Sequence, residues 1–149
     1  MIKPESNGSG FGCTQEDFER LLREGIECLG FSGPVAEHSV ARRTVDLRGV
    51  AVSVISLGEP QDMHDNDIVL AAQLYGAETQ SPHALEFLFE INLANTLAGA
   101  GAFGRDSEGN LLLLKAMRCH ELNGMTLAAH MQWMVALIES VREELRRIH

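Results

Sequence analysis

The sequence is poor in cysteine, in lysine and in long apolar runs, and each shortage argues against a class of protein. The 3 cysteines, Cys13, Cys28 and Cys119, show no C-x-x-C spacing, which indicates neither a disulfide framework nor a zinc knuckle. Lysine occurs only as Lys3 and Lys115, and 12 basic residues face 21 acidic ones, for a formal charge of -9. Such an acidic surface repels phosphate backbones and anionic lipid, which argues against nucleic acid or a membrane surface as partner. No run approaches the roughly 18 apolar residues that membrane insertion requires.

The N-terminus also lacks the apolar segment of a signal peptide. Its first residues, MIKPESNGSGFG, are polar and rich in proline and glycine, so we expect residues 1–13 to form a flexible leader. Residues 14–149 contain no linker or repeat and suit a single domain, which at this size buries roughly 70% of its unfolded surface. These features predict a single domain in a reducing cytoplasm, where Cys28 is expected to pack as a small buried side chain.

Three segments have the periodicity of helices. Thr14 begins a capping-box pattern, and apolar residues then recur at helical spacing until Gly30. Residues 31–39, FSGPVAEHS, are interpreted as a loop. Ser81-Pro82 provides the cap and first turn of a second, very apolar helix. A seam of apolar residues predicts one long final helix: Leu127, Met131, Met134, Ile138, Val141, Leu145 and Ile148.

Strands are predicted between these helices. Residues 41–57 are rich in β-branched side chains and are interrupted at Arg48-Gly49, which predicts two strands joined by a tight turn. Residues 68–76 form a third strand, and the turn residues 107–110 join two more in a hairpin. The resulting order, α-β-β-β-α-β-β-α, predicts an α+β fold with a twisted antiparallel sheet and three helices.

The predicted sheet is apolar on both faces. An antiparallel sheet with one face in water alternates apolar and polar residues, whereas Val52 and Val54 are followed here by Ser53 and Ile55. Residues 111–114 are all leucine, and the helix that starts at Ser81 is apolar nearly all round. We therefore favour a self-association interface, and hence a homodimer, over a filled monomer core.

A literal G-x-G-x-x-G occurs at Gly99, Gly101 and Gly104. In a dinucleotide site these glycines leave a strand and open a helix, so that amide groups face the phosphates. Here a helix precedes the glycines and a strand follows them, which favours a helix C-cap and a close-packed turn. No nucleotide cofactor is therefore expected.

Other candidate sites also have simpler interpretations. Cys119-His120-Glu121 contains a thiol and a base, but neighbours along a strand point to opposite faces. His130 and Trp133 are interpreted as boundary packing beside the apolar seam of the last helix. An acidic loop contains four residues whose side chains could bind a metal ion: Asp62, His64, Asp65 and Asp67. Their spacing fits no ordered metal-binding motif, so the loop is interpreted as solvated.

Two segments carry a resemblance to a known family. The segment LEFLFEINLANTLAGAGAFGRDSEGNLLLLKAMRCHEL, followed by a long amphipathic helix, resembles the Tir-chaperone (CesT) family of class I type III secretion chaperones. FERLLREGIECLGF is similar to the opening helix of that family. The family's helix asparagine falls on Asn92, and the following turn matches Asp106 and Gly109.

The resemblance implies a bacterial cytoplasmic homodimer without catalytic activity, cofactor or membrane insertion. Such a chaperone holds the N-terminal chaperone-binding segment of a secreted effector in extended form and keeps it soluble and competent for secretion. The family pairs through its second helix, which implies dimer contacts at Phe87, Leu88, Ile91, Asn92 and Leu93. Effector contacts are expected on the first helix and the sheet, at Leu22, Ile26, Val52 and Val54.

Two alternatives remain open at this stage. One is a small dimeric regulatory protein of the same fold that sequesters an anti-activator or another regulator. The other is a small thiol enzyme that uses Cys119 or the acidic loop.

Overall fold

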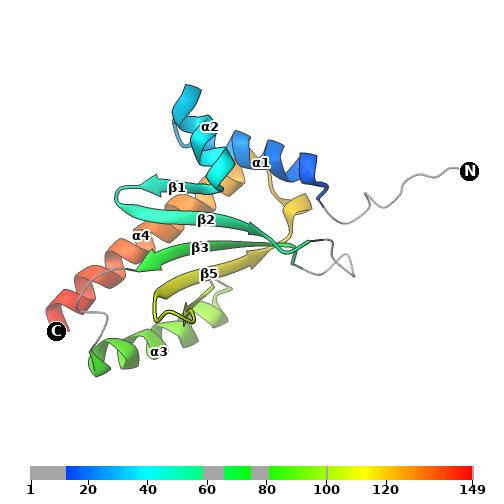
Figure 1. Cartoon of the computed structure of the whole chain (residues 1–149). Coiled ribbons are helices and arrows are strands. Elements are labelled where there is room, and N and C mark those ends of the chain that lie inside the picture. Colours follow the sequence, from blue (N-terminus) through cyan, green and yellow to red (C-terminus); the bar gives the residue numbers. More distant parts are fainter. Residues whose placement is uncertain (1–12, 59–65, 75–80, 100, 149) are drawn as a thin grey trace, which may run out of the picture.

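A computed structural model describes residues 13–58, 66–74, 81–99 and 101–148. The sheet has five strands. Figure 1 shows the long C-terminal helix across one of its faces. The expected leader, apart from Cys13, and most of the acidic loop, with Asp62, His64 and Asp65, lie outside the described residues. The elements are α1 (Gln15–Cys28), α2 (Gly33–Arg42), β1 (Thr44–Leu47), β2 (Val50–Ser56), β3 (Ile68–Leu74), α3 (Pro82–Leu97), β4 (Ala102–Arg105), β5 (Leu111–Met117), the 3-10 turn η3 (Cys119–Glu121) and α4 (Gly124–Ile148).

The α+β class and the antiparallel sheet are confirmed, but the described chain has four α-helices where three were expected. The additional helix is α2, in the segment interpreted as a loop. Pro34 lies in its first turn, and Ala36 and Val40 bury one side of it. An ion pair between Arg23 and Glu37 (2.8 Å) joins it to α1. So short a helix, with two buried apolar side chains one turn apart, gives too weak a periodic signal to be read from the sequence.

The cap and turn predictions are confirmed at α1 and at the first hairpin. The Thr14 hydroxyl accepts a hydrogen bond from the Asp17 amide (3.0 Å), and the Asp17 carboxylate accepts one from the Thr14 amide (3.3 Å). Arg48 (φ 50°) and Gly49 (φ 81°) both have positive φ, as a two-residue type I′ turn between β1 and β2 requires.

A short polar turn joins β4 to β5. The Asp106 carboxylate accepts hydrogen bonds from the amides of Glu108 and Asn110, each at 2.9 Å. The side chain of Asn110 is the largest cause that holds the pKa of Asp106 below its usual value. The turn residues expected from the sequence therefore close the second hairpin.

One core fills the space between α4 and the sheet. The predicted seam of α4 is confirmed, because Leu127, Met131, Met134, Ile138, Val141 and Leu145 are all between 0% and 2% exposed. α1 packs along α4, and α4 in turn packs on β2 and β3. In the described part of the chain, no helix combines the length and the apolar character needed to span a bilayer.

Candidate functional site

The sheet has one face that no described helix covers, which we call the open sheet face. In Figure 1, α4 crosses the opposite face, whereas α1 and α2 lie beyond β1 and α3 lies beyond β5. Strand register places the open-face residues in cross-strand rows, for example Ser53 beside Ala71 and Ala71 beside Leu114. The face is formed by Ala51, Ser53, Ile55, Val69, Ala71, Gln73, Leu112, Leu114 and Ala116.

This face is apolar and accessible. Ile55 is 44% exposed and Leu114 is 37% exposed, while Val69 and Leu112 are half-buried. Contiguous apolar area of this kind marks a protein-binding surface more often than a solvated one. The two-faced apolar pattern of the strands thus includes a face that none of the described helices covers.

α3 is held against the outer strand β4 by one side chain. The Asn92 amide nitrogen donates to the carbonyl of Phe103 (2.9 Å), and the Phe103 amide donates to the Asn92 oxygen (2.6 Å). On the same side of α3, Ala84 and Leu88 are buried at 1% and 4% exposure. These contacts fix which face of the helix turns outward.

The outward face of α3 carries a stripe of large apolar side chains. Phe89, Leu93 and Leu97 are 73%, 66% and 81% exposed and lie four residues apart, so they share one side of the helix. Exposed acidic residues, Glu86 and Glu90, accompany the stripe. We call Phe89, Leu93 and Leu97 the α3 stripe.

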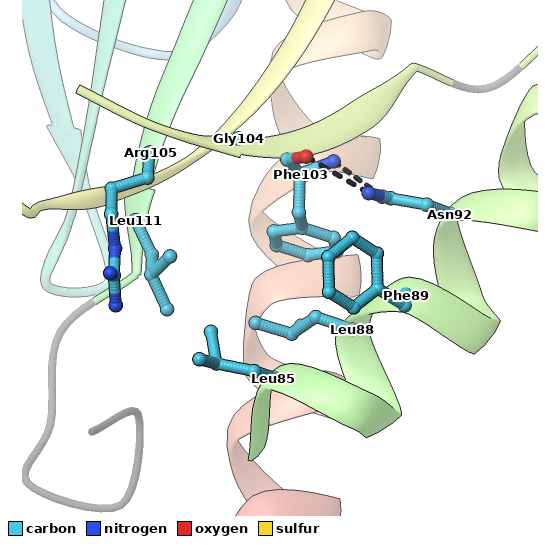
Figure 2. Close-up of a pocket in the computed structure, with 8 residues that line it drawn as sticks. All are labelled: Leu85, Leu88, Phe89, Asn92, Phe103, Gly104, Arg105 and Leu111. Atoms are coloured by element: carbon cyan, nitrogen blue, oxygen red, sulfur yellow. Dashed lines mark hydrogen bonds between the residues drawn. The ribbon is translucent and has the colours of Figure 1, made fainter. Parts of the chain in front are cut away.

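An apolar groove of about 280 Å³ lies between α3 and the β4–β5 hairpin. Figure 2 shows Leu85 and Leu88 on its helix side and Phe103 and Leu111 on its strand side. Arg105 is the charged residue that lines it. The groove adjoins the α3 stripe, since Phe89 belongs to both.

The two edges of the sheet differ. The sheet order β1-β2-β3-β5-β4 places β1 at one edge and β4 at the other. At β4, the backbone groups of Phe103 bond to Asn92, which closes the middle of that edge. At β1, the tight turn makes Leu47 and Val50 a hydrogen-bonded pair, so the backbone groups of Thr44 and Asp46 point away from β2. These backbone groups have no partner within the sheet, so we call β1 the open edge.

The four residues expected to contact an effector are core residues. Leu22, Ile26, Val52 and Val54 are between 0% and 2% exposed, because the apolar periodicity of α1 and β2 marks the side that faces α4. Their role in effector binding stays a prediction. The open-face neighbour Ile55 is accessible where Val54 is not.

The five residues expected at a dimer contact share α3 but differ in exposure. Leu93 is 66% exposed and Leu88 is 4% exposed, while Phe87, Ile91 and Asn92 are half-buried. Their role in pairing stays a prediction. Sequence reasoning did not place Phe89 and Leu97 in the contact, although their spacing of four residues on either side of Leu93 was a readable signal.

The candidate chemical sites do not assemble. Cys119 lies in η3 and is joined to Cys13 in a disulfide, so the cysteines, expected to be unpaired, include one bonded pair. The contact depends on tertiary packing across a separation of 106 residues, which spacing along the chain does not reveal. Cys28 was expected to be buried, but it is exposed, because it lies on the solvent side of the last turn of α1. Within the ranges that the structure describes, no three His, Cys, Asp or Glu residues gather in a group that could hold a metal ion.

The G-x-G-x-x-G segment is a turn from helix to strand, as expected. α3 ends at Leu97, and β4 starts at Ala102. Gly99 (φ 69°) and Gly101 (φ 91°) adopt left-handed backbone conformations between them. The segment therefore lacks the helix N-terminus that a phosphate site needs.

His130 and Trp133 lie at the boundary of the core. Trp133 is 40% exposed, and the Lys115 ammonium lies 5.4 Å from its ring centre. The Lys115 nitrogen is also 3.3 Å from Nδ1 of His130. Burial, and then the charge of Lys115, lower the pKa of His130. This arrangement agrees with the boundary packing expected for both residues.

The described surface thus offers apolar faces, an open strand edge and no assembled catalytic group. The family model of the Tir chaperone protein (CesT) family matches residues 60–142, which is more than half of the chain. The chain belongs to the CesT family. The match starts ahead of β3 and runs through α3, β4 and β5 into α4, so it includes the α3 stripe and the β3 and β5 residues of the open sheet face. No curated protein sequence matches the chain.

Membership gives the chain a general role. The CesT family consists of type III secretion chaperones, which act by binding and not by catalysis. α1, α2, β1 and β2 lie ahead of the matched residues, so the open edge at β1 belongs to the unmatched part.

Proposed function

We propose that this protein is a homodimeric cytoplasmic chaperone that binds the N-terminal segment of a secreted effector and keeps it unfolded and soluble. The observation that carries the proposal is an uncovered apolar sheet face that ends, at β1, in an open strand edge. An extended peptide satisfies both features at once. Its backbone pairs with an edge strand, and its alternate side chains cover apolar area.

The effector contacts lie on the open sheet face in this proposal. Ile55, Val69 and Leu114 replace the buried residues expected from the sequence, because they are accessible on the sheet. Backbone groups of Thr44 and Asp46 supply the hydrogen bonds for an added strand. Backbone pairing tolerates many sequences, so a chaperone of this kind requires an apolar pattern in its client rather than one fixed motif.

The dimer contact lies on α3. Burying the α3 stripe against a second copy removes Phe89, Leu93 and Leu97 from water, where they are otherwise 66–81% exposed. Phe87 and Ile91 are partly buried against the core, and with Leu88 and Asn92 they support this contact from within the chain. Placing the dimer on α3 leaves the β1 end of the sheet, on the far side of β2, β3 and β5, available to the client.

The test is co-expression with the N-terminal segment of the secreted-type protein encoded beside this gene. The segment is expected to be soluble and to copurify with the wild-type chain. Leu114→Glu places a charge on the β5 side of the open sheet face and should reduce the recovered segment at least tenfold, which corresponds to about 1.4 kcal/mol of binding free energy.

Met125→Glu is the matched control. Met125 is 75% exposed at the start of α4, away from the open sheet face, so this variant should retain the segment. An insoluble segment with the wild-type chain contradicts the proposal for that client. Equal recovery with Leu114→Glu and Met125→Glu would show that the client does not use the open sheet face.

A further inference from the structure

Two cysteines far apart in the sequence meet beside the start of α1. Cys13 and Cys119 are separated by 106 residues, and their Cα atoms lie 5.8 Å apart, within the usual range for a disulfide. Cys119 is 3% exposed and belongs to the core cluster, whereas Cys13 is half-buried against that cluster. Cys13 is thus the more exposed residue of the pair.

Independent contacts hold each cysteine in place. Cys13 directly precedes Thr14, whose capping box fixes the first turn of α1. The amide of Cys119 donates to the buried carboxylate of Asp67 at 2.7 Å. The Asp67 amide in turn donates to the carbonyl of Met117 at 3.0 Å, at the end of β5. The two backbone positions are therefore set by packing and capping, whether or not the sulfurs are bonded.

We propose that Cys13 and Cys119 form a reversible, redox-sensitive staple between the start of α1 and the junction of β5 with α4. The oxidant is a low-molecular-weight disulfide such as glutathione disulfide. The thiolate of Cys13, the more accessible sulfur, attacks it and releases one glutathione thiolate. The Cys119 thiolate then attacks the mixed disulfide at Cys13 and releases the second. Two protein thiols lose two protons and two electrons, and the oxidant becomes two glutathione molecules.

The disulfide changes the free energy of unfolding more than it changes the folded structure. Oxidation closes a very long loop in the unfolded chain, which lowers the entropy of that state. The reduced protein remains folded because the core of α1, α4 and the sheet does not depend on the bond. For a loop of this length, oxidation should raise the melting temperature by on the order of 10 °C.

Thiol counting on the full chain tests the pairing. After treatment with glutathione disulfide, denaturation and alkylation with N-ethylmaleimide, the wild-type chain should carry a single modification, at Cys28, either as the maleimide adduct or as a mixed disulfide with glutathione. After dithiothreitol it should carry adducts on all 3 cysteines. Cys28 is the built-in control, because it is exposed at the far end of α1, about 20 Å along the helix from Cys13.

Thermal melting tests the consequence. Dithiothreitol should lower the melting temperature of the oxidised wild type and of Cys28→Ser, but should not change that of Cys13→Ser. Cys13→Ser acts at the half-buried partner and leaves Cys119 in the core as a small apolar side chain. Cys119→Ala provides a second unpaired chain. Three alkylated thiols after oxidation, a glutathione that persists on Cys13, or equal melting with and without dithiothreitol would each overturn the proposal.

Discussion

At the scale of the residue, Asn92 shows how one polar side chain orients an apolar helix. α3 is apolar nearly all round, so burial alone does not select which side faces the sheet. The two hydrogen bonds between Asn92 and the backbone of Phe103 make that selection. They also close the outer edge of β4 to a further strand. The structure thereby gives a physical reason for an asparagine that the sequence marked only by its resemblance to a family.

Asn92→Ala should therefore destabilise the fold. It leaves the amide and the carbonyl of Phe103 without their partners, and we expect a loss of about 2–3 kcal/mol in the free energy of unfolding by urea. Hydrogen exchange at the Phe103 amide should accelerate in the same variant. Thr96→Ala, at an exposed position of the same helix, should cost less than about 0.5 kcal/mol. Similar urea midpoints for the two variants would contradict this role of Asn92.

At the scale of the element, the turn from α3 to β4 depends on two glycines with different constraints. Gly99 (φ 69°) and Gly101 (φ 91°) both have a backbone that L side chains rarely adopt. A Cβ at Gly99 would meet open space, whereas one at Gly101 would lie 2.4 Å from the carbonyl oxygen of Leu114. The pattern that resembled a phosphate loop is thus a turn that brings the chain close to β5.

Substitution of Gly99 and of Gly101 separates the energetic cost of the backbone conformation from the cost of steric crowding. Gly99→Ala should cost about 1–2 kcal/mol, the usual penalty of a left-handed backbone conformation for alanine. Gly101→Ala should cost at least ~2 kcal/mol more, because the methyl group also displaces the backbone of β5. Urea unfolding of both variants measures the difference. If the two cost the same, the close approach to Leu114 does not constrain the turn.

At the scale of the whole molecule, the α3 stripe and the open sheet face are separate apolar surfaces on one small acidic domain. The stripe lies beyond the β4 end of the sheet, whereas the open edge lies at β1. Two binding events on one chain, to a second copy and to a client, need such a separation. The net charge of -9 keeps a protein with this much exposed apolar area from associating unspecifically.

Leu93→Glu tests the dimer, because Leu93 is the middle residue of the α3 stripe. Light scattering should give about twice the chain mass of 16.3 kDa for the wild type at micromolar concentration, and the single chain mass for the variant. Val35→Glu, an equally accessible apolar position on α2, should stay dimeric. A monomeric wild type would refute the homodimer, and a dimeric Leu93→Glu would place the contact elsewhere.

The sequence by itself determined the elements that local chemistry specifies. The capping box at Thr14, the turn at Arg48-Gly49 and the polar turn after Asp106 fix helix starts and hairpins through contacts within a few residues. The apolar seam of α4 was equally readable, because one periodicity runs through the whole helix. The apolar character of both sheet faces was also readable, and in the structure no described helix covers one of them, while the self-association inferred from this pattern stays a prediction.

Only the tertiary structure decided which apolar side is core and which is surface. Periodicity shows that Leu22 and Val52 share a face with their apolar neighbours along the chain, but it does not show what packs on that face. In the structure both residues are buried. The disulfide of Cys13 with Cys119 and the bonds from Asn92 to Phe103 likewise depend on how whole elements pack. Local sequence encodes dihedral preferences and the relative direction of side chains, whereas contacts between elements depend on the packing of the complete chain.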